Sequence, residues 1–167
     1  MDFYPPNRWA VVRTSSGDIP EFGIYEAQFS GSAPAPEWTA VSLPFTPTRV
    51  QPAIAAQRGS AYVLASDGSR ATDHLLVVSA DDSVTDDTGP CVNAVDADLS
   101  ATPVGNALWA ACKTGHAESL AISSDDGAHW VPVDAERGGQ SNAATIGAIS
   151  GSVAAVGPPT GPLELEH

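Results

Sequence analysis

Hydrophobic and polar residues alternate in short runs along most of this chain, and these runs are separated by residues typical of turns. The clearest example is Ser119–Ser123, which leads into an acidic turn and then into a second alternating run, Trp130–Asp134. Two such runs with Asp and Gly between them predict antiparallel strands joined by a tight turn. The same pattern predicts further strands at residues 9–13, 23–29, 38–43, 50–56, 60–65, 74–79, 96–102, 107–112, 143–149 and 152–156, with only a weak strand after residue 82. The chain is therefore expected to be all-β.

The turn in this hairpin recurs at a regular interval. It reads Ser-Ser-Asp-Asp-Gly-Ala-His-Trp over residues 123–130, or S-x-D-x-G-x-x-W. A weaker copy at Ser79–Ser83, 44 residues upstream, keeps Ser and Asp but lacks Gly and Trp. Trp38 lies 92 residues before Trp130, which is two units of 46. A period in the mid-forties is the length of one four-stranded propeller blade, so we expect antiparallel four-stranded β-propeller blades, about three to three and a half per chain.

The period also divides the chain. The predicted blades are residues 8–45, 48–88, 91–136 and, in part, 143–157, between a flexible segment at 1–7 and a tail at 158–167 whose last three residues resemble a vector tag. The first blade lacks an innermost strand. Three and a half blades do not close a ring, which typically needs four to eight. Either the chain is a piece of a larger propeller, or two copies close one ring as a homodimer.

Composition and charge narrow the class of partner. Fifteen Gly and fourteen Pro indicate many turns, and a hydrophobic content of 43% is enough for a core. The formal charge of −13 argues against nucleic acid, because phosphate binding needs Lys and Arg. No apolar stretch approaches the ~20 residues of a membrane-spanning helix. The remaining partners are an unknown protein or glycan ligand.

The two cysteines, Cys91 and Cys112, have no zinc-ligand spacing, so no metal site is expected. Each lies in an apolar, strand-like context. Two neighbouring strands joined by a loop would place them side by side, which predicts a structural disulfide worth roughly 3 kcal/mol. The alternative is two separate buried thiols. A disulfide implies a secreted, periplasmic or cell-surface protein whose signal segment has been removed.

The Ser123–Trp130 segment, its flanking strands and the blade-length period resemble the Asp-box (BNR) repeat family. That family includes sialidases, photosystem-assembly-factor-like propellers and many exported bacterial proteins. Through its period, the resemblance covers about Trp9 to Val156. It implies a structural role for the box, in which Ser123 and Asp125 bond turn amides, Gly127 accepts positive φ and Trp130 packs between sheets. The paired cysteines are similar to those of actinobacterial members.

Catalytic chemistry is not expected. Sialidases carry an arginine in an F/Y-R-I-P segment, whereas Gly17-Asp18-Ile19-Pro20 has none. The acidic run Asp81–Asp87 lacks the order of a calcium loop, so we interpret it as a solvated, decayed Asp-box loop rather than a calcium site. His74, His116 and His129 are expected to be surface or turn residues. No catalytic residue and no cofactor is predicted.

The sequence therefore favours a non-catalytic exported binding or assembly module. The alternative is a fragment of a glycoside-processing propeller whose catalytic residues are incomplete here.

Overall fold

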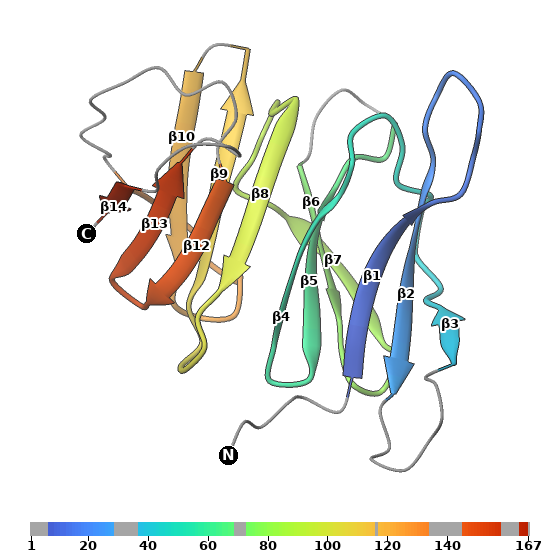
Figure 1. Ribbon diagram of the computed structural model, residues 1–167, viewed down its shortest axis with the longest axis horizontal. Coiled ribbons are helices and arrows are strands. Elements are labelled where there is room, and N and C mark those ends of the chain that lie inside the picture. Colours follow the sequence, from blue (N-terminus) through green and yellow to red (C-terminus); the bar gives the residue numbers. More distant parts are fainter. Residues whose placement is uncertain are drawn as a thin grey trace.

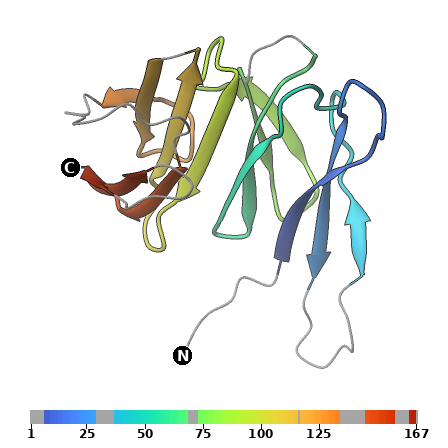
Figure 2. The same ribbon diagram turned by 45° about the horizontal axis from the view of Figure 1, so that its top comes forward.

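The computed structural model describes residues 7–28, 37–68, 73–115, 117–133, 145–157 and 164–166. Within these residues the chain forms strands and turns but no helix, and the strands build four antiparallel sheets that stand side by side (Figures 1 and 2). Two sheets have four strands and two have three. The prediction of an all-β fold made of antiparallel four-stranded propeller blades is confirmed.

The second and third sheets are complete. The second contains β4 (Ala53–Gln57), β5 (Ser60–Ala65), β6 (His74–Val78) and β7 (Val84–Thr88), paired in that order. The strand expected only weakly after residue 82 is therefore a full strand, β7.

The third sheet repeats this up-and-down order. It contains β8 (Asp96–Ala101), β9 (Leu108–Thr114), β10 (Ala117–Ser123) and β11 (Val131–Val133). Consecutive strands pair with their nearest neighbours in sequence, as expected for hairpins closed by short polar turns.

In the part of the chain that the structure describes, each of the two outer sheets has three strands. The first contains β1 (Asn7–Arg13), β2 (Phe22–Gln28) and β3 (Trp38–Ala40). The predicted flexible segment falls almost entirely on residues 1–6, which lie outside the described residues.

The fourth sheet contains β12 (Thr145–Ser150), β13 (Val153–Gly157) and β14 (Glu164–Glu166). Strand β14 was not predicted, because these residues were assigned to the tail. It pairs antiparallel with β13 through the main chain. Main-chain pairing makes little demand on side-chain pattern, so the hydrophobic pattern gave no sign of this strand.

Hydrophobic clusters fill the spaces between successive sheets. Because the second sheet is covered on both faces, β5 is apolar at nearly every position instead of alternating, with Tyr62, Val63 and Leu64 all buried. Full burial of one such side chain contributes roughly 1.5–3 kcal/mol. The main residues at the three junctions, in order along the row of sheets, are Ile24, Val63 and Leu76; Leu64, Leu75, Leu99 and Leu108; and Trp109, Leu120, Ile146 and Val156.

Candidate functional site

The turn between β10 and β11 is held by the polar side chains of the S-x-D-x-G-x-x-W segment. The Ser123 hydroxyl donates to Asp125 Oδ1 at 2.8 Å and accepts the amide N–H of Gly127 at 2.9 Å. The amide N–H of His129 donates to the same Asp125 oxygen at 2.9 Å. These bonds pin both ends of the turn, as expected when short oxygen side chains lie beside Gly between two strands.

The backbone of this turn enters the left-handed region at two consecutive residues. Asp126 has φ 59° and Gly127 has φ 92°. In the weaker upstream copy, Asp82 has φ 63°, and the Ser83 amide and hydroxyl both donate to Asp81 Oδ1, at 3.2 and 2.7 Å. The copy at Ser79–Ser83 therefore keeps part of the turn geometry without the glycine, because Asp tolerates this conformation better than most residues.

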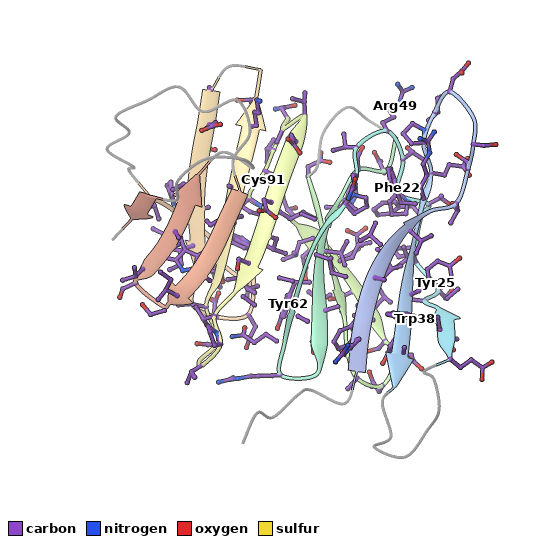
Figure 3. All side chains as sticks on the ribbon, in the orientation of Figure 1. Phe22, Tyr25, Trp38, Arg49, Tyr62 and Cys91 are labelled. Atoms are coloured by element: carbon purple, nitrogen blue, oxygen red, sulfur yellow. A yellow bond between two sulfur atoms is a disulfide. The ribbon has the colours of Figure 1, made fainter. Side chains whose placement is uncertain are left out.

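The same turn also contacts the neighbouring sheet. The Tyr62 hydroxyl, on β5, donates to Asp126 Oδ1 at 3.3 Å. A Cβ added at Gly127 would lie 2.7 Å from Leu75 Cδ2, on β6. Trp130 packs against the cluster that joins the second and third sheets. The segment thus fixes a hairpin and its packing against the preceding blade, and in Figure 3 Tyr62 lies beside the third sheet.

Two ionisable groups, one in this turn and one that contacts it from β5, have shifted pKa values. Burial, reinforced by the charge of Asp126 and its hydrogen bond and opposed by Arg58, raises the pKa of Tyr62 from 10.0 to about 12. Hydrogen bonds from the His129 side chain and backbone, then from Ser123, lower the pKa of Asp125 from 3.8 to about 2. The His129 ring, 2.6 Å from Asp125 Oδ2, is otherwise exposed. The carboxylate of Asp125 is thus stabilised in its charged form as an acceptor.

The two cysteines form a disulfide, as predicted. Cys91 precedes β8, Cys112 lies on β9, and their Cα atoms are 5.1 Å apart. Both residues are buried in the cluster between the second and third sheets. The bond therefore ties the entry of the third blade to its second strand.

A further group of titratable side chains was not predicted. His74 begins β6, and its Nδ1 lies 2.8 Å from Asp86 Oδ1 on β7. Its Nε2 faces Asp67 at 3.7 Å and Asp73 at 4.0 Å, and the Phe45 ring lies 4.6 Å away, centroid to centroid. Burial lowers the pKa of His74, but the hydrogen bond and charge of Asp86 and the charges of Asp73 and Asp67 outweigh it, so the pKa is raised above 6.5.

This cluster corrects the interpretation of His74 as a plain surface or turn residue: it is a strand residue with its side chain 29% exposed. The only sequence signal was the Asp73-His74 pair, because Asp67 and Asp86 come together with it through the β5–β6–β7 pairing. His116 lies outside the described residues.

Two cavities have acidic walls. One, of about 330 Å³, is lined by Asp73, His74, Asp86, Asp87, Thr88 and Val92, and the other, of about 430 Å³, by Glu26, Glu37, Thr39, Ala40, Val41, Ser42 and Asp82. Within the described ranges, no three His, Cys, Asp or Glu side chains are grouped so that they could hold a metal ion. The acidic run Asp81–Asp87 divides between a turn and β7, so only its first part is a loop.

No helix in the described part of the chain is long and apolar enough to cross a membrane.

No protein-family model and no curated protein sequence matches this chain. Among solved structures it is similar to that of YCF48 bound to D1 peptide, with 13% sequence identity and a TM-score of 0.46. The match covers 99% of this chain and 57% of that one, so this chain spans little more than half the length of that neighbour.

Proposed function

We propose that this chain is a non-catalytic, exported binding or assembly module built from Asp-box propeller blades. The observation that carries the proposal is where the polar atoms of the box are engaged. Asp125 and Ser123 bond within the turn, and Asp126 accepts a hydrogen bond from Tyr62 on the preceding blade. These contacts support a structural role for Ser123, Asp125, Gly127 and Trp130, with a ligand bound elsewhere on the blades.

The compartment part of the proposal rests on the disulfide. Cys91 and Cys112 are both buried, and their bond lies within a hydrophobic cluster between two blades. Disulfides of this structural kind form and persist in oxidising surroundings, which supports a secreted, periplasmic or cell-surface location. We propose that the ligand is a protein or a glycan. The formal charge of −13 on this chain favours a ligand that is not itself acidic, because like charges repel.

The test compares turnover with binding on the same preparation. We expect no hydrolysis in a screen of aryl glycosides, and saturable binding to members of a peptide library or a glycan array. Asp125→Asn serves as the matched variant: it should lower the melting temperature because the acceptor of the His129 amide is weakened, and leave ligand binding unchanged when folded. Hydrolysis by the wild-type chain that is lost in folded Asp125→Asn would overturn the proposal in favour of a glycosidase.

A further inference from the structure

The chain contains two Asp-Gly steps, and the structure holds them differently. One is Asp67-Gly68, after β5, and the other is Asp126-Gly127, in the box turn. In such a step the main-chain nitrogen of glycine can attack the side-chain carboxyl carbon of the aspartate, and glycine has no Cβ to hinder the approach. The attack closes a five-membered succinimide ring, and it is favoured because both reacting groups belong to one chain. The surroundings of the amide and the carboxyl group therefore decide which step reacts.

In the box turn, both reacting groups are engaged. Gly127 is buried, and its N–H donates to Ser123 Oγ at 2.9 Å. Asp126 Oδ1 accepts a hydrogen bond from the Tyr62 hydroxyl at 3.3 Å. The Gly127 nitrogen would have to give up its bond inside a buried turn before it could attack. The fold therefore protects this step.

The step after β5 is more accessible. The Asp67 side chain is 46% exposed, so water can reach its carboxyl group. The Gly68 N–H donates to Ser66 Oγ at 3.4 Å, which is longer than the usual range for such a bond and therefore weak. The fold thus restrains the Gly68 nitrogen less than it restrains the Gly127 nitrogen.

A proton donor lies beside this carboxyl group. His74 Nε2 is 3.7 Å from Asp67 Oδ2 and 4.0 Å from Asp73 Oδ1, while its Nδ1 is 2.8 Å from Asp86 Oδ1. Burial lowers the pKa of His74, but Asp86, Asp73 and Asp67 together outweigh it, so the ring stays protonated to a higher pH than usual. With Nδ1 held by Asp86, the second N–H of the protonated ring is placed to act as a general acid toward Asp67.

We propose that Asp67 is a site of isomerisation to isoaspartate through a succinimide, with His74 as the proton donor. The Gly68 nitrogen bonds to Asp67 Cγ, and the Cγ–Oδ2 bond breaks. The oxygen leaves as water, with one proton from the Gly68 amide and one from His74, which regains its proton from solvent. Water then opens the ring at the main-chain carbonyl carbon. Asp67 is left joined to Gly68 through Cγ, with a free α-carboxylate and no change in mass.

The product changes the main chain beside an acidic cavity. Isomerisation adds one methylene group to the main chain between β5 and β6 and moves the free carboxylate away from its present position next to His74. That histidine lines the cavity of about 330 Å³, so the modification alters the charges around this cavity. The inference does not depend on whether the blades bind a ligand as proposed.

The test follows both steps in one sample of the full chain with its disulfide intact. The folded protein is incubated at neutral pH in water labelled with oxygen-18, and peptide mapping by mass spectrometry locates the label that ring opening introduces. Isoaspartate is counted separately with an isoaspartyl methyltransferase. We expect both signals to accumulate at least ~10-fold faster at Asp67 than at Asp126. In urea the two steps should react at similar rates, because the hydrogen bonds of the box are lost.

Two variants separate the roles of the residues. Asp67→Glu keeps the charge but would need a six-membered ring, so it should abolish labelling at this position. His74→Gln removes the proton donor and should slow labelling at Asp67 at least ~5-fold while leaving Asp126 unchanged. If that variant does not fold, the wild-type chain still decides, because Asp67 should react faster in the folded chain than in urea.

Two results would overturn the inference. Labelling at Asp67 as slow as at Asp126 in the folded chain would show that the fold protects both steps. Labelling that is undiminished in folded His74→Gln, or that is slower in the folded wild-type chain than in urea, would remove His74 as the proton donor.

Discussion

Replacing Gly127 by alanine tests whether the box turn is a packing device between blades. Gly127 has φ 92°, and a side chain there costs of order 1–3 kcal/mol in backbone strain. The new Cβ would also lie 2.7 Å from Leu75 Cδ2 on the preceding blade, and relieving such overpacking costs typically about 1–3 kcal/mol. We expect a loss of about 2–6 kcal/mol, a large share of the roughly 5–15 kcal/mol that stabilises a typical domain.

The assay is urea unfolding with the disulfide intact, and two other glycines supply matched controls. Gly115 has φ 61° but open space around its would-be Cβ, so Gly115→Ala reports the backbone term alone, about 1–2 kcal/mol. Gly147, on β12, also has open space and no positive φ, so Gly147→Ala should be neutral or stabilising by about 0.4–1 kcal/mol.

The contact between the two blades is separated from the turn by a double mutant. In Gly127→Ala combined with Leu75→Ala, the clash disappears, so the loss should be smaller than the sum of the two single losses by about 1–3 kcal/mol. The reasoning is refuted if Gly127→Ala destabilises no more than Gly115→Ala, or if the two substitutions in the double mutant are additive.

Three further outcomes follow from the other contacts. Because the pKa of His74 is raised in the folded chain, protonation of this ring stabilises the fold below pH 6.5, and the stabilisation is lost as the pH rises through the pKa of the folded state. The free energy of unfolding, measured in urea between about pH 6 and 8, should therefore depend less on pH in His74→Asn than in the wild-type chain. Tyr62 should ionise only near pH 12, so the absorbance titration at alkaline pH should lose its latest step in Tyr62→Phe, and an unchanged curve would contradict the burial of the phenol. Reducing the Cys91–Cys112 disulfide should cost about 3 kcal/mol, measured as a shift of the urea midpoint with and without reductant.

Much of the fold was predictable because its strands and hairpin turns depend on local sequence patterns. Alternation marked the expected strands, and the hairpin of β10 and β11 contains both its strands and its turn within the 17 residues Ala117–Val133. The disulfide was predictable for the same reason, since Cys91 and Cys112 lie on segments that a single blade brings together. The weak point was β7, whose Val-Thr-Asp-Asp-Thr sequence is acidic and exposed and therefore lacks an apolar face.

Contacts between distant segments could not be predicted from periodicity. Tyr62 and Asp126 are 64 positions apart and meet only because consecutive blades pack face to face. The surroundings of His74 depend on the register of three strands and on Phe45, which lies before β4. A pattern with a period of two indicates which face a residue occupies, but not which residue of the next blade lies opposite it.

Burial explains why the box of the third blade keeps its glycine and the weaker copy in the second blade does not. Gly127 is buried under Leu75, so a side chain there would be strained and crowded. Ser83, at the matching position of the preceding blade, is exposed, and its side chain bonds Asp81 instead. The glycine is thus required by packing against a neighbour rather than by the turn alone, since Asp82 holds a positive φ without a following glycine. If this is the basis of the motif, its presence reports how two blades fit together and carries no information about a ligand. The chemistry of recognition must then be sought on parts of the blades other than the box, whose polar atoms are engaged within the turn.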